Sequence, residues 1–398
     1  MEKVLFVCPD YSLGGFTTFT LNMAAELSRR GYECAALVLH RRGACKSQFY
    51  QSLPGTTLCQ REMESRLSYL QRLSNTIEQQ NARILLLNGV PCVQALLPSL
   101  RVDALRISVV HSPNNLEVSE GTENLKYLNA VVGVSRGIVE AIRKLRGQTG
   151  VVREIPVGVN IGPAAKEGRS GQPIALLYVG RLTRCAKNLR RLIEIAEHLM
   201  AMQTPFRLTV VGDGEARLEL ERAANARFPP SVVKFTGLLS RQDVRRQMQL
   251  HDVLLLTSEY EGTPHVVLEA MAEGTIPVVS AIEGSTDRIL SHGKTGFLCN
   301  TGGPSEFVDC IQKLAACPQM RHYISQEARN SVARDFSITH IVDEYIRLFT
   351  ETATELPPEV PLKDLLASAR VNRLVPSPVR HLRARVGECY RGLLRRQA

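Results

Sequence analysis

Short apolar segments alternate with amphipathic segments along most of this 398-residue chain, and the pattern occurs in both halves. The strand-like segments of the first half are 3–8, 34–39, 82–89, 106–111 and 130–135. Those of the second half are 174–180, 206–212, 232–237, 252–258 and 276–280. Continuous apolar strands flanked by helices are typical of parallel sheets buried on both faces. The sequence therefore predicts an α/β protein with two Rossmann-like, doubly wound domains.

A stretch rich in Gly, Pro and charge, 162–173, separates the two halves and predicts an interdomain linker. We expect an N-terminal domain over 1–163, a C-terminal domain over 164–338, and a crossover helix with a basic tail over 339–398. The polar residues 41–66 predict a loop. Open α/β sheets bind ligands at the carboxyl ends of their strands, so we expect the ligand site in the cleft between the domains.

The positive charge of the chain is concentrated at its end. Residues 361–398 hold nine Lys/Arg and two Asp/Glu, a net charge of +7, which leaves +3 of the chain's +10 for the rest. A basic tail without a basic body argues against a nucleic-acid enzyme and for a local electrostatic contact. Apolar residues at helical spacing in 379–394 predict an amphipathic helix on an anionic membrane surface, such as would suit a lipid-linked acceptor. The alternative is a helix packed on the body, or a frayed end.

Other global features exclude several classes of protein. The sequence contains no run of 18 uncharged apolar residues, so no membrane-spanning helix is expected. The first apolar segment is not followed by a cleavage site of the kind found in signal peptides. The ten cysteines form no C-x-x-C pair, so we expect reduced thiols and no structural zinc. We therefore expect a cytoplasmic protein, with the tail as its contact to the inner face of the membrane.

Two glutamates eight positions apart give the most informative motif. Glu261 is expected in the loop before a helix and Glu269 on that helix, so the two carboxylates can hold different hydroxyl groups of one ligand. Gly262 allows backbone to approach a ligand closely. Thr263 is expected to cap the helix and Pro264 to be its first residue, which leaves free N–H groups for phosphate oxygens. Taken alone, two such glutamates would fit an ordinary amphipathic helix with a solvated Glu at each end.

A pair of cations follows the first strand of the second half. Arg181 comes directly after that strand and Lys187 precedes the next helix. Arginine offers a forked contact and lysine a point charge, a combination that suits a diphosphate. The alternative is a solvated helix start. In the first half, Gly14 and Gly15 open a helix, and His111 ends an apolar strand, where it is expected to face the cleft.

These motifs together resemble the retaining glycosyltransferases of family 4, which have the GT-B fold. The resemblance covers roughly residues 3–348 and is strongest in the second half. It includes residues around the glutamate pair: Ser258, Glu261, Gly262, Pro264, Leu268, Glu269, Ala270, Met271, Ala272, Gly274 and Pro277. It implies that Glu261 binds hydroxyls of the donor sugar and that Glu269 binds the ribose. Arg181 and Lys187 would neutralise the leaving diphosphate.

The resemblance also implies roles for the other candidates. Gly14 and Gly15 would lie near the donor phosphates, and His111 would contact the transferred sugar. Loops around the nucleobase would include Gly212, Gly237 and Leu238, whose backbone would bond to the base edge. The helix start at Thr263, Pro264 and His265 would stabilise the leaving charge.

The implied activity is transfer of a sugar from a nucleoside-diphosphate sugar to an acceptor hydroxyl, with retention, in surface glycan or glycolipid biosynthesis. The acceptor would be a saccharide or a lipid-linked saccharide; no nucleic acid, cofactor or metal is expected. Asp213 and Glu215 imitate an acidic metal motif, but a helix cap at Asp213 is the preferred interpretation. The alternatives are a sugar-nucleotide epimerase or phosphorylase of similar fold, and a catalytically silent scaffold subunit. The sequence does not name the base, the sugar, the acceptor or the oligomeric state.

Overall fold

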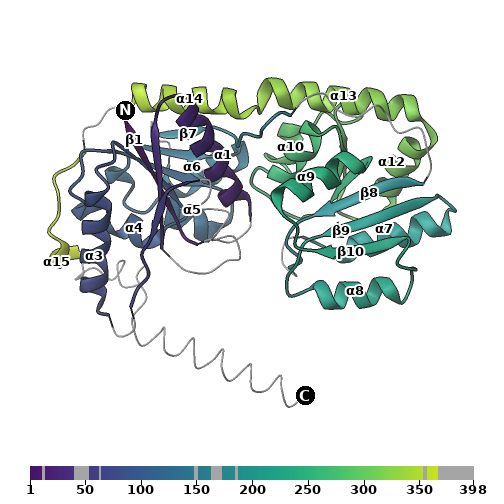
Figure 1. The fold of residues 1–398 in the computed structure, drawn as a ribbon, viewed down its shortest axis with the longest axis horizontal. Coiled ribbons are helices and arrows are strands. Elements are labelled where there is room, and N and C mark those ends of the chain that lie inside the picture. The colour runs from purple at the N-terminus through teal and green to yellow at the C-terminus, as the bar shows by residue number, and fades with distance from the viewer. Residues whose placement is uncertain are drawn as a thin grey trace, which may run out of the picture.

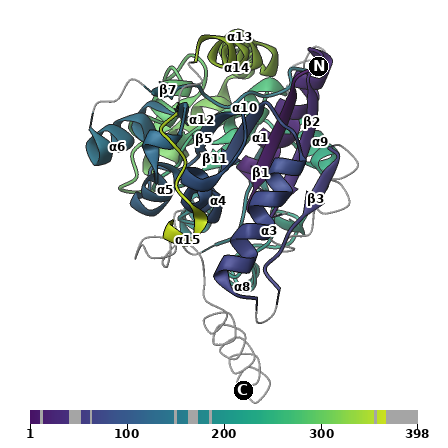
Figure 2. The same ribbon diagram turned by 90° about the vertical axis from the view of Figure 1, so that its left-hand side faces the viewer.

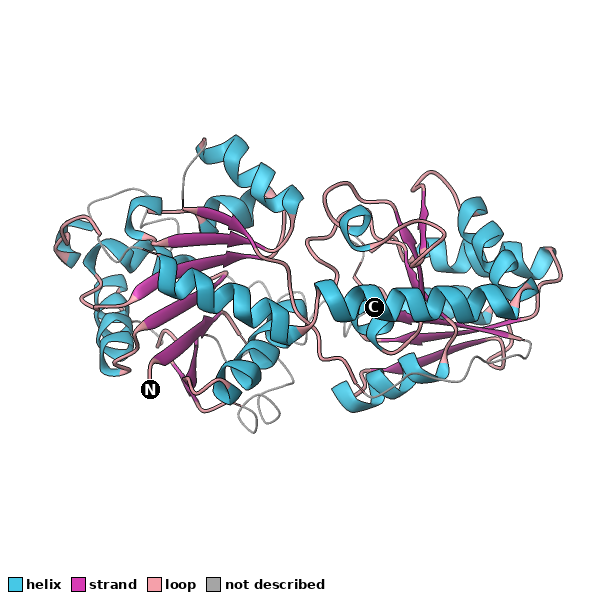
Figure 3. Ribbon diagram, turned by 90° about the horizontal axis from the view of Figure 1, so that it is seen from above, coloured by secondary structure: helices cyan, strands magenta, loops and turns pink. Residues whose placement is uncertain are grey.

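Two α/β lobes lie side by side in the computed structural model, and two long consecutive helices run along one side of both (Figures 1 and 3). The structure describes residues 1–10, 14–39, 53–61, 64–147, 151–162, 173–183, 187–352 and 356–365. In that part of the chain each lobe has a parallel sheet with helices on its faces, as the sequence predicts.

The N-terminal lobe has a seven-stranded parallel sheet in the order β3-β2-β1-β4-β5-β6-β7 among the described residues. Its strands are β1 (Lys3–Cys8), β2 (Glu33–Val38), β3 (Gly55–Thr57), β4 (Ile84–Asn88), β5 (Leu105–Val110), β6 (Ala130–Gly133) and β7 (Val152–Glu154). Its helices are α1 (Gly15–Arg29), α3 (Arg66–Gln79), α4 (Pro91–Leu96), α5 (Asn115–Gly121) and α6 (Arg136–Arg146), with short 3-10 turns at Leu97–Ser99 and Leu125–Tyr127. The central strands are buried almost completely, which explains their unbroken apolar sequences.

The C-terminal lobe repeats this design with a six-stranded parallel sheet in the order β10-β9-β8-β11-β12-β13 among the described residues. Its strands are β8 (Ile174–Val179), β9 (Phe206–Val211), β10 (Val233–Gly237), β11 (Val253–Leu256), β12 (Ile276–Ser280) and β13 (Phe297–Cys299). Its helices are α7 (Arg190–Ala201), α8 (Arg217–Asn225), α9 (Arg241–Leu250), α10 (His265–Ala272), α11 (Thr286–Ile289) and α12 (Ser305–Ala316).

The chain passes between the lobes at two adjacent points. After α13 (Pro318–Asp335), which belongs to the C-terminal lobe, α14 (Ile338–Glu351) returns to the N-terminal lobe and packs against α1. The return lies beside the outward passage, because Val159 N donates to Phe336 O at 2.9 Å and Ile338 N donates to Val159 O at 2.9 Å. Two short passages held together in this way form the hinge between the lobes.

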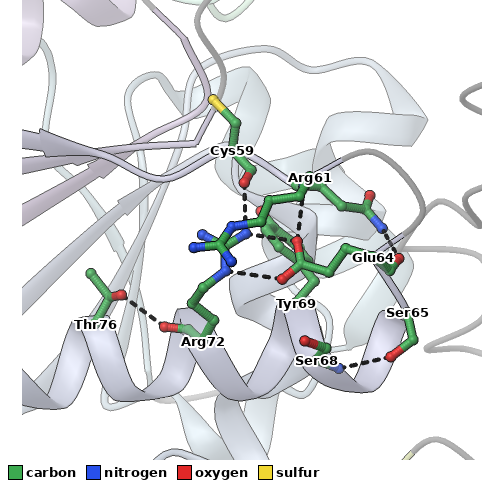
Figure 4. A network of polar contacts seen from close by, with 10 residues as sticks. Cys59, Arg61, Glu64, Ser65, Ser68, Tyr69, Arg72 and Thr76 are labelled. Carbon is green, nitrogen blue, oxygen red and sulfur yellow. Dashed lines mark hydrogen bonds and ion pairs between the residues drawn. The ribbon is translucent and has the colours of Figure 1, made fainter.

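The segment before α3 is fixed to that helix by a polar network (Figure 4). Ser65 caps α3 by accepting a hydrogen bond from Ser68 N at 3.1 Å. Arg72 donates to both carboxylate oxygens of Glu64, at 2.9 and 2.7 Å, and to Cys59 O at 2.7 Å. The Arg72 hydrogen bonds lower the pKa of Glu64. A two-pronged ion pair thus holds irregular backbone beside the sheet edge.

The chain after α14 runs back across the N-terminal lobe, ending in α15 (Leu362–Leu365) beside α3 (Figures 1 and 2). Val360 N donates to Pro98 O at 2.8 Å, and Val360, Leu362 and Leu365 pack against the core. The first five residues of the predicted tail, 361–365, therefore pack on the body. The predicted amphipathic helix lies outside the described residues.

Some expectations fail or fall outside the described residues. The predicted loop 41–66 contains β3, which extends the sheet beyond β2 with three residues, and the start of α3. Most of the predicted linker and the 163/164 boundary lie outside the described residues. No helix in the described part of the chain is long and apolar enough to cross a membrane. The described cysteines are all free thiols.

Candidate active site

The candidate site residues follow strands at the places where the strand order reverses. The order changes direction between β1 and β4 in the first sheet and between β8 and β11 in the second. Such a reversal leaves a crevice outside the carboxyl ends of the strands. Gly14 and Gly15 follow β1, Arg181 follows β8, and Glu261 follows β11.

One cavity of about 1130 Å³ lies between the lobes and brings these residues together. The predicted residues that line it are Gly14, Gly15, His111, Arg181, Lys187, Gly212, Leu238, Glu261, Gly262, Thr263, Pro264, His265 and Glu269. Gly237 is outside the lining and immediately precedes Leu238. Residues that lie far apart in the sequence, and that were selected for their chemistry, thus line one cavity.

Lys187 and Glu261 form an ion pair near the place where the strand order of the second sheet reverses, between β8 and β11. Lys187 Nζ lies 2.5 Å from Glu261 Oε1, which also accepts a hydrogen bond from Ser258 Oγ at 2.7 Å. Thr257 Oγ1 donates to Lys187 O at 2.9 Å and fixes the backbone of the lysine. The pair is mostly buried, with side chains 21% and 16% exposed. A cation and a carboxylate are thereby held ready in the cavity at no net charge.

Arg181 is exposed within the cavity, and the opposite lobe presents an acidic side chain toward it. The carboxyl group of Glu117, on α5, has its pKa raised by burial, while Asn114 and Arg181 act in the opposite direction. Glu117 also lines the cavity. No local sequence pattern indicates Glu117, because its approach to Arg181 depends on how the two lobes face one another.

Glu269 presents a carboxyl group to the cavity without an ion pair or hydrogen bond to any described side chain. Burial raises its pKa to about 7, Arg241 lowers it, and Glu273 raises it further. A largely desolvated carboxyl group can accept hydrogen bonds from the hydroxyls of a ligand. This is the property that the ribose role of Glu269 requires.

His111 faces the cavity from the end of β5, as the sequence predicts. Its Nε2 lies 3.0 Å from Asn88 Oδ1, an oxygen that can only accept, so Nε2 carries the hydrogen and Nδ1 is left as an acceptor. Phe19 packs edge-on against the ring with centroids 5.1 Å apart. Burial lowers the pKa of His111 to about 4, so the imidazole is neutral at neutral pH.

The start of the glutamate helix differs from the prediction. α10 begins at His265, so Pro264 occupies the N-cap position that was predicted for Thr263. Thr263 instead donates its hydroxyl hydrogen to Val134 O of the N-terminal lobe. The Thr263 side chain thus joins the two lobes and does not cap the helix. Because the proline at the N-cap has no side-chain acceptor, the first N–H groups of α10 have no side-chain cap.

Gly212, directly after β9, and Gly237, the last residue of β10, are joined by a backbone hydrogen bond. Gly212 N donates to Gly237 O at 2.9 Å, so this N–H and this carbonyl satisfy each other. A side chain at Gly212, where φ is +138°, would overlap Gly180 O. Gly212 N–H and Gly237 O are therefore already paired within the protein, while Leu238 lines the cavity.

The acidic residues after Gly212 do not form a cap or a metal cluster. α8 begins at Arg217, so the predicted cap at Asp213 is wrong, and Glu215 precedes the helix. Asp213 accepts from Gly214 N at 2.8 Å and from Arg217 at 3.3 Å. Within the described ranges, no group of three His, Cys, Asp or Glu side chains could hold a metal ion.

One connection across the cavity was missed from the sequence. Arg241, the first residue of α9, donates from Nη2 to Asn22 Oδ1 on α1 at 2.7 Å. Asn22 also donates to Gly158 O at 3.3 Å, next to the hinge. Asn22 and Arg241 are 219 positions apart in the chain, and no local pattern indicates such a pairing.

The comparisons with known proteins agree with this geometry. Residues 164–331 match the model of the family "Glycosyl transferases group 1". Alpha-D-kanosaminyltransferase of Streptomyces kanamyceticus is 27% identical over 184 residues, which are 46% of this chain and 47% of the relative. The lipopolysaccharide core biosynthesis glycosyltransferase LpsE of Rhizobium meliloti is 25% identical over 350 residues, which are 84% of this chain and 95% of the relative.

Solved structures share the two-lobed fold. HepE of Anabaena in complex with UDP and glucose superposes with a TM-score of 0.75 at 17% identity, over 88% of this chain and 100% of HepE. TarM of S. aureus, in complex with Fondaparinux, alpha-GlcNAc-glycerol and UDP, gives a TM-score of 0.75 at 12% identity, over 88% of this chain and 100% of TarM. Residues 164–331 therefore resemble the glycosyl transferases group 1 family, and the chain has the GT-B fold.

Proposed function

We propose that the protein is a retaining glycosyltransferase that moves a sugar from a nucleoside-diphosphate sugar to an acceptor hydroxyl, in surface glycan or glycolipid biosynthesis. The observation that carries the proposal is the cavity between the lobes, where Arg181 and Lys187 lie with Glu261 and Glu269 at the carboxyl ends of parallel strands. Cations of this kind suit a diphosphate, and carboxylates suit sugar and ribose hydroxyls.

The donor binds mainly to the C-terminal lobe in this proposal. Glu261 holds hydroxyls of the transferred sugar, Glu269 holds the ribose, and Leu238 lies by the base. Arg181 and Lys187 take up the charge of the leaving diphosphate, so the reaction needs no metal. His111, with Nδ1 free to accept, contacts the transferred sugar from the N-terminal lobe.

The acceptor enters from the N-terminal lobe and attacks on the face from which the diphosphate departs. No carboxylate acts as a nucleophile in this route, and a phosphate oxygen of the leaving group takes the acceptor's proton. The reacting centre gains oxocarbenium character as the bond to the diphosphate lengthens. Closure of the lobes excludes water and limits hydrolysis of the donor. The acceptor is proposed to be a saccharide or a lipid-linked saccharide, met at the inner face of the membrane.

The test is a donor panel. We would incubate the purified protein without metal with UDP-, GDP-, ADP-, dTDP- and CMP-sugars, measure released nucleotide, and record melting shifts with the free nucleotides. Release or stabilisation by one nucleoside diphosphate is expected. Silence in both assays with a folded sample would contradict the proposal and favour a silent scaffold. Interconversion of the sugar nucleotide without transfer would favour an epimerase, and phosphate-dependent cleavage a phosphorylase.

A further inference from the structure

His265 is a buried side chain at the start of α10. The residue is only 8% exposed, and neither Nδ1 nor Nε2 has a hydrogen-bond partner among the described residues. Nevertheless the residue lines the cavity between the lobes. Buried polar atoms without partners cost free energy, so an imidazole retained in this position is expected to find a partner in another state of the protein.

The surroundings of His265 indicate the charge of that partner. A Cβ added at Gly15 would lie 3.0 Å from His265 Cδ2 and 3.7 Å from Nε2, so the ring lies against the start of α1. α10 starts at His265 itself. The two N-cap residues, Gly14 and Pro264, have no side-chain acceptor for the first N–H groups of either helix. The positive ends of a 15-residue and an 8-residue helix therefore meet at this ring.

The charge of the imidazole fits the same partner. Burial, with smaller contributions from His111 and Arg241, lowers the pKa of His265 to about 3. The ring is thus neutral at neutral pH, with one N–H to donate. An N–H donor between two helix N-termini matches an anionic oxygen.

We propose that the His265 side chain binds the diphosphate of the donor, donating its ring N–H to a phosphate oxygen that lies between the starts of α1 and α10. This inference rests on the proposed function and adds a side-chain contact to the backbone contacts of the helix start. A phosphate oxygen at His265 can be reached from both lobes, so its binding favours their closed arrangement.

The test compares two variants with one control. His265→Phe keeps a ring of similar size without a donor, and His265→Gln restores an N–H. His322→Phe, on the exposed face of α13, is the control. Binding of the nucleoside diphosphate selected by the donor panel, of its nucleoside, and of inorganic pyrophosphate would be measured by calorimetry or competition. The ring nitrogens would be followed by NMR in ¹⁵N-histidine-labelled protein.

We expect His265→Phe to weaken binding of the diphosphate about tenfold or more, the size of a hydrogen bond to a charged group. Affinity for the nucleoside should stay unchanged, His265→Gln should recover most of the loss, and pyrophosphate should shift the His265 ¹⁵N signals in the wild type. Equal loss for nucleoside and diphosphate would overturn the proposal, since it would indicate a packing role.

The test also separates this inference from the proposed function. Unchanged diphosphate affinity in His265→Phe, with turnover intact, would overturn the inference alone and would assign any phosphate at this ring to the acceptor. Failure of the wild type to bind any nucleoside diphosphate or pyrophosphate would overturn both.

Discussion

Lys187 and Glu261 form an ion pair in the cavity, and this pair positions both side chains for a ligand. Glu261 accepts from both Lys187 and Ser258, so neither the carboxylate nor the ammonium group is buried without a partner. A donor whose sugar hydroxyls bond to Glu261 and whose diphosphate approaches Lys187 can replace these contacts without leaving a charge exposed to apolar surroundings. The residues are thereby pre-positioned, which lowers the cost of ordering them during the reaction.

At the residue scale, Lys187→Ala tests the diphosphate contact. Removal of one preorganised cation from the leaving group is expected to lower kcat about a hundredfold or more. The circular dichroism spectrum should be unchanged, since Thr257 holds backbone rather than side chain here. The measurement is released nucleotide under saturating donor. Arg190→Ala is the matched control, because Arg190 is 89% exposed and pairs only with Glu194 on its own helix in the described structure; near-normal turnover in Lys187→Ala would contradict the role.

A second prediction at this scale concerns the pKa of Glu269. Because its folded-state pKa is raised from 4.5 to about 7, the folded protein keeps a proton that the unfolded chain loses, and stability falls as pH rises through this window. Glu269→Gln removes the titration. The wild type should therefore lose about 1 kcal/mol of unfolding free energy relative to the variant between about pH 6 and pH 8. Denaturant unfolding of both proteins at the two pH values measures it, and a constant difference would argue against a buried, unpaired carboxyl group.

Elements with a long apolar sequence were predictable because burial on both faces leaves a strong pattern. β1, β8 and β12 lie within one residue of the predicted segments. The edge strands β3, β7 and β13 were missed, since each has three residues and little sequence for a pattern. Helix starts were misjudged where a tertiary contact was stronger than local preference, as at Thr263, whose hydroxyl bonds to the other lobe.

The same division applies to the candidate site. Residues at the ends of predicted strands, such as Arg181 and His111, could be placed in the cleft because parallel strands share one carboxyl edge. Asn22 and Glu117 could not be placed there from the sequence, because they line the cavity only as a result of how the two lobes are oriented toward one another. The sequence pattern predicts the fold of each lobe separately, whereas the cavity is lined by residues of both lobes.

At the element scale, truncation after residue 365 tests the basic tail. Val360, Leu362 and Leu365 pack on the N-terminal lobe, so deletion of 366–398 removes seven net positive charges from the tail without disturbing this contact. We expect binding to anionic vesicles at low salt to fall several-fold, since each basic residue near such a surface contributes about 1 kcal/mol. Cosedimentation measures it, with zwitterionic vesicles as the control. Unchanged binding would favour a tail packed on the body.

At the scale of the whole molecule, small residues let the two lobes approach one another closely. Gly137 N donates to Gly284 O at 3.2 Å, and a Cβ at Gly284 would lie 2.8 Å from Gly137 Cα. Arg241 bonds to Asn22 nearer the hinge. The chain passes between the lobes beside Val159 and beside Phe336, and these two passages are hydrogen-bonded to one another. Opening about this hinge can therefore release the ligand while each sheet stays intact.

Gly262 is the position where this closure can be tested with one methyl group. A Cβ there would overlap His111 O of the other lobe, so Gly262→Ala is expected to hold the cleft open. Misplacement of the lobes by about 1 Å should lower transfer roughly a hundredfold. Small-angle scattering should give a larger radius of gyration, while the melting temperature changes little because neither sheet is touched. Gly302→Ala is the control, since a Cβ there meets no described atom within 4 Å. Normal transfer in Gly262→Ala would mean that the reaction does not need the closed form.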